Sequence, residues 1–133
     1  MENRKLTRVA ELGMIIIFSL SLVFHALVLL QMIDFKMVWG GKMKTVSDMY
    51  KMETVSLFVN FFLLIIILMK TQVIKRGFPP KVITVSLWLM FSLFLLNTLG
   101  NLFSESLLET IIFTPITILL SFFCLILLKS KES

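Results

Sequence analysis

Four long apolar runs constrain this chain more than any other feature. They cover about residues 12–33, 50–69, 82–103 and 110–128, and charged residues cluster between them. A helix needs about 20 mostly apolar residues to cross a hydrocarbon core of ~30 Å. A soluble domain of 133 residues has too small a core to bury four such runs, and 58% apolar residues is too many for a disordered chain. The sequence therefore predicts a small integral membrane protein and excludes a water-soluble enzyme.

The runs are expected to be helices rather than strands. In lipid every backbone polar group needs an internal partner, and the runs lack the alternation of apolar and polar residues that a barrel strand shows. Pro79 and Pro80 separate the second run from the third, and Ser47-Asp48 is a plausible N-cap for the second helix. We therefore predict an all-α fold, in which residues 1–133 form a single membrane domain built as a four-helix bundle.

The distribution of Lys and Arg predicts the orientation. The N-terminal tail, the second loop and the C-terminal tail carry nine of these residues; the first loop carries four and the third none. Because cytoplasmic loops carry the excess of positive charge, both termini are expected in the cytoplasm, with the chain a multi-pass protein of the cytoplasmic membrane. The four lysines of the first loop weigh against this orientation. We attribute the net charge of +5 to basic residues that flank the spans, where they set the orientation in the membrane and contact anionic lipid headgroups. It does not indicate nucleic-acid binding.

Motifs that carry familiar chemistry are missing from the sequence. It has no nucleotide-binding glycine loop, no metal-binding Cys/His pair and no nucleophile elbow. Its one cysteine, Cys124, is read as a small buried residue of the fourth span. We expect no cofactor and no metal, and we assign no catalytic residue.

Polar residues inside the spans gather on one face of each expected helix. Such residues are costly to place against lipid, so they tend to face a bundle interior or a cavity. At 100° per residue, each group falls within a narrow arc of its helix. The groups are Ser21 and His25; Glu53, Ser56 and Asn60; Ser86, Asn97, Asn101 and Ser104; and Thr110, Thr114, Thr117 and Ser121.

The depths of these residues point to a site in the outer half of the membrane. Counted from the outer ends of their helices, His25, Asn60, Asn97 and Thr117 each lie ~10–12 Å deep, and so form one layer. Glu53 and Asn101 lie above it. We predict an outward-opening polar pocket lined by these six residues. The alternative is that the Ser and Thr residues only pack the helices together.

The outer loop supplies a second group of candidate residues: Trp39, Gly40, Gly41 and Lys42. The two glycines followed by a lysine suit contact with a phosphate or a lipid headgroup. Trp39 also fits an interfacial aromatic belt, and the glycines also fit a structural turn.

The leading functional interpretation is a non-enzymatic membrane protein whose pocket binds a small polar ligand or a lipid headgroup. Three alternatives stay open: a structural or accessory subunit without a ligand, a transporter or channel that works as an oligomer, and a membrane enzyme that uses His25 and Glu53 as an acid/base pair. The partners expected from the sequence are membrane lipids, with a further copy of the chain or another membrane protein as a possible addition. No nucleic acid is expected.

Three short segments carry a family resemblance. Val38-Trp39-Gly40-Gly41-Lys42, Asn97-Thr98-Leu99-Gly100-Asn101-Leu102 and Phe113-Thr114-Pro115 resemble a group of small, uncharacterised bacterial four-span membrane proteins. The resemblance covers nearly the whole chain. It implies the four-span architecture and a location in a bacterial inner membrane, and it implies no activity.

Overall fold

The computed structural model describes residues 4–38, 43–75 and 77–130. This part of the chain contains four helices long and apolar enough to cross a membrane, and no strand. The helices are α1 (Arg4–Leu29), α2 (Val46–Lys70), α3 (Pro80–Leu102) and α4 (Thr114–Lys129). The fourth span is the helical stretch Glu109–Lys129, which includes the turn that precedes α4. A short 3₁₀ turn, η1 (Phe35–Met37), follows α1, and a π-helical turn, η3 (Glu109–Phe113), leads into α4. The predicted all-α membrane fold is confirmed.

The helix ends differ in detail from those predicted. Helix α2 is capped by Thr45, whose side chain accepts a hydrogen bond from the Asp48 backbone N–H at 3.1 Å, so the N-cap predicted at Ser47-Asp48 is wrong. Helix α1 stops before the predicted end at residue 33, because Gln31 adopts the left-handed conformation that closes many helices. Helix α3 begins at Pro80, where the fixed φ of proline suits the first turn.

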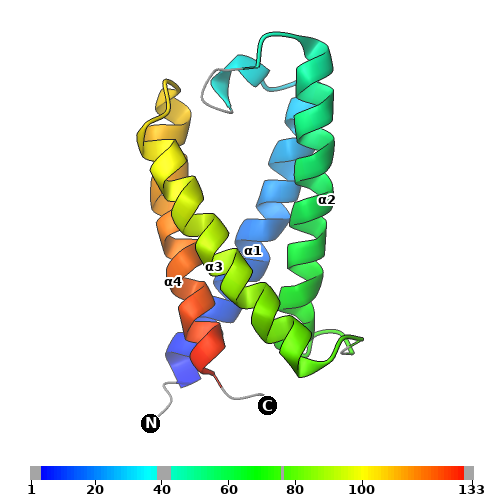
Figure 1. Ribbon diagram of the computed structural model, residues 1–133, viewed down its shortest axis with the longest axis vertical. Helices are drawn as coiled ribbons and strands as arrows, with labels where there is room; N and C mark the ends of the chain where they lie inside the picture. Colours follow the sequence, from blue (N-terminus) through cyan, green and yellow to red (C-terminus); the bar gives the residue numbers. More distant parts are fainter. Residues whose placement is uncertain (1–3, 39–42, 76, 131–133) are drawn as a thin grey trace.

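The helices associate as two pairs. Helix α1 packs along α2, and α3 packs along α4. Helices α1 and α3 cross, so the two pairs approach at one end and diverge at the other (Figure 1). The start of α1, the end of α4 and the α2–α3 connection lie at one end of the molecule, which we call the terminal end. The far end carries the α1–α2 and α3–α4 connections.

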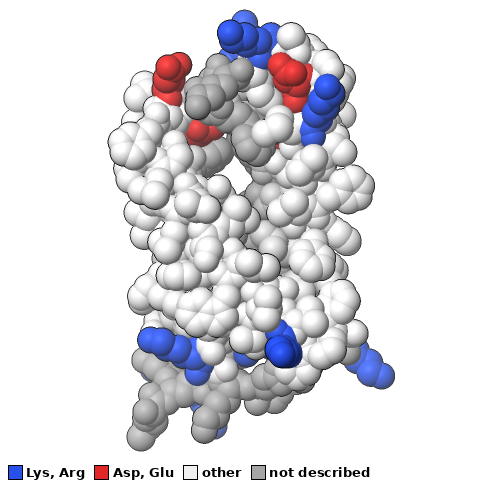
Figure 2. Space-filling model, in the orientation of Figure 1, with Lys and Arg blue, Asp and Glu red and all other residues white. Residues whose placement is uncertain are grey.

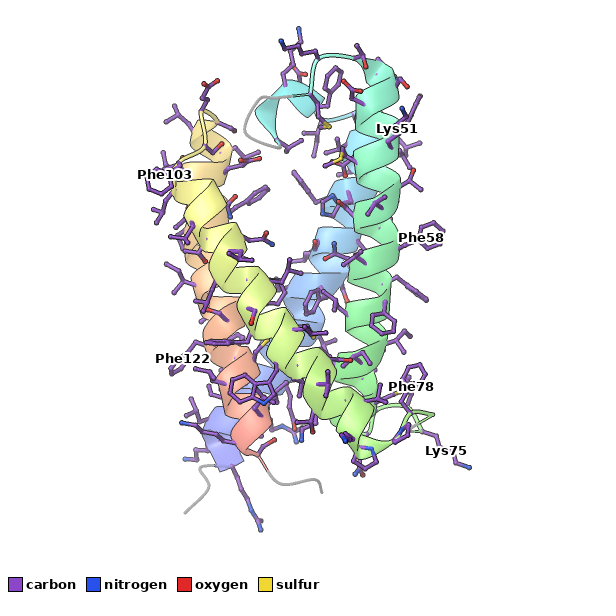
Figure 3. The ribbon with its side chains drawn as sticks, in the orientation of Figure 1. Lys51, Phe58, Lys75, Phe78, Phe103 and Phe122 are labelled. Atoms are coloured by element: carbon purple, nitrogen blue, oxygen red, sulfur yellow. The ribbon has the colours of Figure 1, made fainter. Side chains whose placement is uncertain are left out.

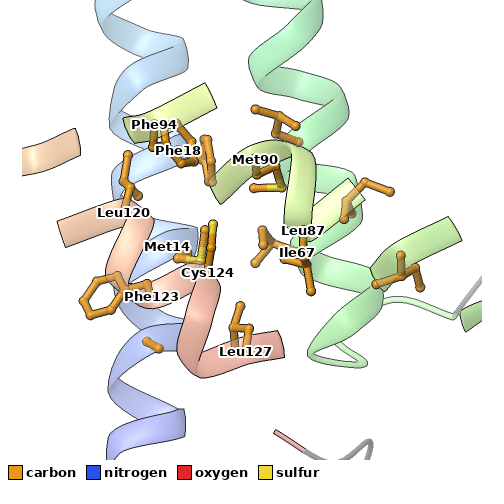
Figure 4. Packing of buried hydrophobic residues seen from close by; sticks show 14 residues of the cluster. Met14, Phe18, Ile67, Leu87, Met90, Phe94, Leu120, Phe123, Cys124 and Leu127 are labelled. Carbon is orange, nitrogen blue, oxygen red and sulfur yellow. The ribbon is translucent and has the colours of Figure 1, made fainter. Parts of the chain in front are cut away.

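The main apolar core lies in the terminal half (Figure 4). All four helices contribute to it, and its buried members include Met14, Phe18, Ile67, Met90 and Leu127. Phe18 and Phe94 join the two pairs with ring centroids 5.8 Å apart. The terminal half of a single chain is therefore filled by apolar side chains.

The outer surface of the bundle is also apolar. Phe58, Phe103 and Phe122 project away from the helices in Figure 3 and are 73%, 85% and 53% exposed. Apolar residues at such exposure are costly in water but suit hydrocarbon. This surface fits the interpretation of the four helices as membrane spans.

A second, smaller core lies at the far end. It joins Val28 and Met49 to Val38 and Met43 of the α1–α2 connection. Phe24 of α1 meets Phe113 of η3 edge to face, with ring centroids 5.2 Å apart. These contacts link the two helix pairs again at the far end.

Candidate polar site in the far half of the bundle

His25 and Glu53 form the closest polar contact between α1 and α2 that the structure describes. The His25 Nδ1 atom lies 2.5 Å from Glu53 Oε2. The Glu53 side chain is completely buried and that of His25 is 17% exposed. With its proton on Nδ1 the imidazole donates to the carboxylate, which fixes the orientation of the ring. The pair therefore holds an ionisable group inside a membrane span and can hold or pass a proton.

Asn60 joins the same two helices one layer deeper. Its Oδ1 accepts a hydrogen bond from Ser21 Oγ at 3.0 Å, and its Nδ2 donates to the Ser56 carbonyl at 2.8 Å. Asn60 is half-buried, and these two hydrogen bonds fix the position of its amide. The polar faces predicted for the first two spans thus meet along the α1–α2 contact.

Helices α3 and α4 form a separate polar contact. Thr98 and Thr117 are hydrogen-bonded through their hydroxyls at 2.9 Å, and Asn101 Nδ2 lies 3.5 Å from the Thr117 hydroxyl. Thr98 also donates to the Phe94 carbonyl in its own helix, at 2.8 Å. Thr98 was not among the predicted site residues. Thr98 directly follows Asn97 and lies about 100° from it around the helix, so the polar face predicted for the third span did not include it.

The predicted layer is therefore divided between the two helix pairs. The hydrogen bonds Ser21–Asn60 and His25–Glu53 join α1 to α2, and the hydrogen bonds Thr98–Thr117 and Asn101–Thr117 join α3 to α4. Asn97 has no side-chain hydrogen bond among the described residues and is exposed.

The exposure of Asn97 follows from the divergence of the pairs. Asn97 lies seven residues after Met90, about 20° away around α3. Met90 is buried at 1% exposure, whereas Asn97 is uncovered on nearly the same face. The side of α3 that faces lipid lies in another direction, marked by Leu96 and Leu99 at 65% and 53% exposure. Figure 2 shows the molecule hollowed between the two pairs in the same half.

Charges differ between the two pairs at the far end. On the α3–α4 side the described charged residues are Glu105 and Glu109, and Glu109 is 6% exposed in the π-helical turn. The α1–α2 side carries Lys36, Lys44 and Lys51 beside its acidic residues. Acidic and basic side chains both surround the upper end of the hollow in Figure 2.

Two grooves on the surface of the bundle are apolar. One of about 100 Å³ lies between α2 and α3, and one of about 330 Å³ lies on the opposite side of α2, against α1. Neither is lined by a predicted pocket residue. Within the described ranges no three His, Cys, Asp or Glu side chains come together as a metal site would require. The predicted outer-loop contacts Trp39, Gly40, Gly41 and Lys42 lie outside the described residues.

Comparison with known proteins finds no match among family models, curated proteins or solved structures.

Proposed function

We propose that this protein binds a small polar ligand or a lipid headgroup between its two helix pairs, in the outer half of a bacterial cytoplasmic membrane. In this proposal both termini are cytoplasmic, as the distribution of Lys and Arg predicts, and the far end faces outward. Membership of the bacterial four-span group belongs to the same proposal.

One observation carries the proposal: the face of α3 that is buried at Met90 is exposed at Asn97. An exposed amide that faces away from lipid is unusual in a span, because polar side chains in hydrocarbon seek a partner. A ligand between the pairs supplies one. The half-buried amide of Asn60 and the His25–Glu53 pair stand on the opposite helix pair.

These groups favour a ligand rich in hydrogen-bonding atoms. Amide side chains both donate and accept, and the imidazole–carboxylate pair adds an ionisable partner. The apolar core of the terminal half forms the floor below them. A single chain thus suits binding better than transport, since a continuous polar path would require an oligomer.

The test is ligand-induced thermal stabilisation of the purified protein. The panel consists of soluble headgroup compounds, including glycerophosphoethanolamine, glycerophosphocholine and glycerophosphoglycerol. We expect at least one compound to raise the unfolding temperature, and Asn97→Leu to remove that shift. Ser92→Leu, a polar-to-apolar change at an exposed position of α3, serves as the matched control. An unchanged shift in Asn97→Leu contradicts the proposal.

A second function is favoured by the His25–Glu53 contact itself. A buried carboxylate that orients an imidazole is the arrangement of an acid/base pair, here at the level of a lipid headgroup. This enzyme hypothesis predicts that the protein converts a component of a total lipid extract, and that His25→Gln and Glu53→Gln both stop the conversion. Lipid mass spectra that are identical with and without the protein exclude it. The accessory-subunit alternative stays a prediction, favoured if no panel compound binds.

A further inference from the structure

We propose that the terminal end of the bundle holds the phosphate of an anionic phospholipid, at a site around Lys70 and Lys129 where α2 and α4 end. The lipid belongs to the leaflet at this end of the molecule and bridges the two helix pairs. The inference goes beyond the proposed function, because it concerns the opposite end of the bundle from the polar site.

The first argument is the sign of the charges at the terminal end. The described residues there include seven basic side chains and one acidic side chain, whereas the far end carries both signs in similar number. Figure 2 shows Lys and Arg side chains along the terminal end and the acidic side chains at the far end. Three of the basic residues lie in the first two turns of α1, and the others are Lys70, Lys75, Lys81 and Lys129; the acidic residue is Glu11. Such a surface attracts anionic lipid.

The second argument is the contact that positions Lys70. Its Nζ atom donates to the Ser130 carbonyl at 3.4 Å, so the last residue of α2 reaches the residue that caps the end of α4. Lys129 directly precedes Ser130. Two lysines from opposite helix pairs therefore lie around one carbonyl. An ammonium group has three N–H donors, and this contact uses one of them, so Lys70 can also donate to a phosphate.

The third argument is the burial of Lys70. Its side chain is half-buried, and an ammonium at the end of a span is stabilised by an anionic partner. Around α2, Lys70 lies about 20° from Leu63, which lines the groove facing α3. Around α1, Glu11 lies about 20° from Leu22, which lines the groove on the opposite side of α2. The described carboxylate of this end thus lies away from Lys70, and a lipid phosphate supplies the missing charge.

The position of the two lysines favours a lipid as the source of the phosphate. Lys70 and Lys129 are the last residues of two apolar helices, so their ammonium groups lie where hydrocarbon meets the headgroups. Phe122 lies seven residues before Lys129, about 20° away around α4. It is 53% exposed and projects away from the bundle in Figure 3. An acyl chain attached to the bound phosphate therefore meets an apolar surface directly below it.

The experiment separates a site at Lys70 from the general attraction of a basic surface. The full chain is reconstituted in nanodiscs with equimolar phosphatidylglycerol and phosphatidylcholine of identical acyl chains. The lipids that stay bound after extraction into a mild detergent are counted by native mass spectrometry. We expect the protein to retain phosphatidylglycerol preferentially. Lys70→Gln is expected to lower the ratio of the two retained lipids about fivefold, which is the contribution of one lysine near a membrane.

The matched control is Lys75→Gln. It removes the same charge at the same end, from an exposed side chain that projects away from the bundle (Figure 3). We expect it to leave the lipid ratio within about twofold of the original, because an exposed charge away from the site is screened by salt. Lys70→Arg is expected to keep the ratio, since a guanidinium also donates to a phosphate.

The lipid ratios decide the proposal. Equal ratios in Lys70→Gln and Lys75→Gln overturn it, because a basic surface without a site gives that result. Equal retention of the two lipids by the unchanged protein also overturns it. Thermal unfolding in phosphatidylcholine shows whether Lys70→Gln folds. If it does not, Lys129→Gln at an exposed position decides: a ratio lowered below that of Lys75→Gln supports the site, and a ratio equal to it overturns the site.

Discussion

Replacing Phe18 with alanine tests whether the apolar core of the terminal half holds the two helix pairs together. Phe18 is 1% exposed and contacts Phe94 of the other pair. Within a membrane, lipid chains are as apolar as the core, so removing the ring changes no free energy of transfer from water. The cost of the substitution is the packing that it removes. Removing about 100 Å³ of side chain at about 24 cal/mol per Å³ of cavity costs about 2–3 kcal/mol of the free energy of unfolding.

The assay is reversible unfolding in mixed micelles, followed by circular dichroism as the fraction of denaturing detergent rises. Phe58→Ala is the matched control, because it makes the same chemical change on α2 at a side chain that is 73% exposed. We expect the control to change the free energy of unfolding by less than about 0.5 kcal/mol. Equal losses in the two variants would refute the assignment of the core.

Three further predictions concern the polar contacts and the topology. We expect a double-mutant cycle with His25→Gln and Glu53→Gln, measured by the same unfolding assay, to give a coupling free energy of about 1 kcal/mol or more. Polar contacts in membranes typically contribute ~0.6 kcal/mol. A coupling free energy near zero would show that the 2.5 Å contact contributes no stability. Thr98→Val lowers the free energy of unfolding by about 0.5–1 kcal/mol because it removes the hydroxyl bonded to Thr117, whereas Thr54→Val at an exposed position does not; equal effects contradict this. In a Cys124→Ala background an impermeant maleimide added to intact cells labels Glu105→Cys and spares Lys75→Cys, and the reverse labelling shows the opposite orientation.

The number and type of the helices followed from hydropathy alone, and the carboxyl-terminal ends predicted at residues 69, 103 and 128 lie within one residue of those observed. The end of α1 and the starts of α1 and α2 did not follow from hydropathy. Apolar runs mark where a chain crosses lipid, whereas a helix ends where its backbone groups find a cap. Helix α1 extends back to Arg4, well outside the apolar run, and α2 is capped by Thr45 rather than by the predicted pair. The start of α3, marked by Pro79 and Pro80, lies two residues before the predicted one, and the fourth span begins at Glu109, one residue before its predicted start.

The polar site was predictable within each helix and less so between helices. Counting residues from the outer ends placed His25 level with Asn60 and placed Glu53 above them, whereas the structure pairs His25 with Glu53 and pairs Asn60 with Ser21. A functional role for His25 and Glu53 stays a prediction. The same counting grouped Asn97 with Thr117, yet Thr117 bonds to Thr98 and Asn101 instead. The difference arises from the crossing of the helices, because the angle at which they pack depends on both partners and leaves no periodic mark in either sequence.

The most direct test of the account is water accessibility along α3 at the far end. Single cysteines are placed at Asn97, Asn101, Leu96 and Leu99 in a Cys124→Ala background, and a small charged thiosulfonate reagent is added from outside. The account predicts fast reaction at Asn97 and Asn101, which face the space between the pairs, and slow reaction at Leu96 and Leu99, which face lipid. Equal rates at all four positions, or no reaction at Asn97, would contradict a polar site open between the two helix pairs.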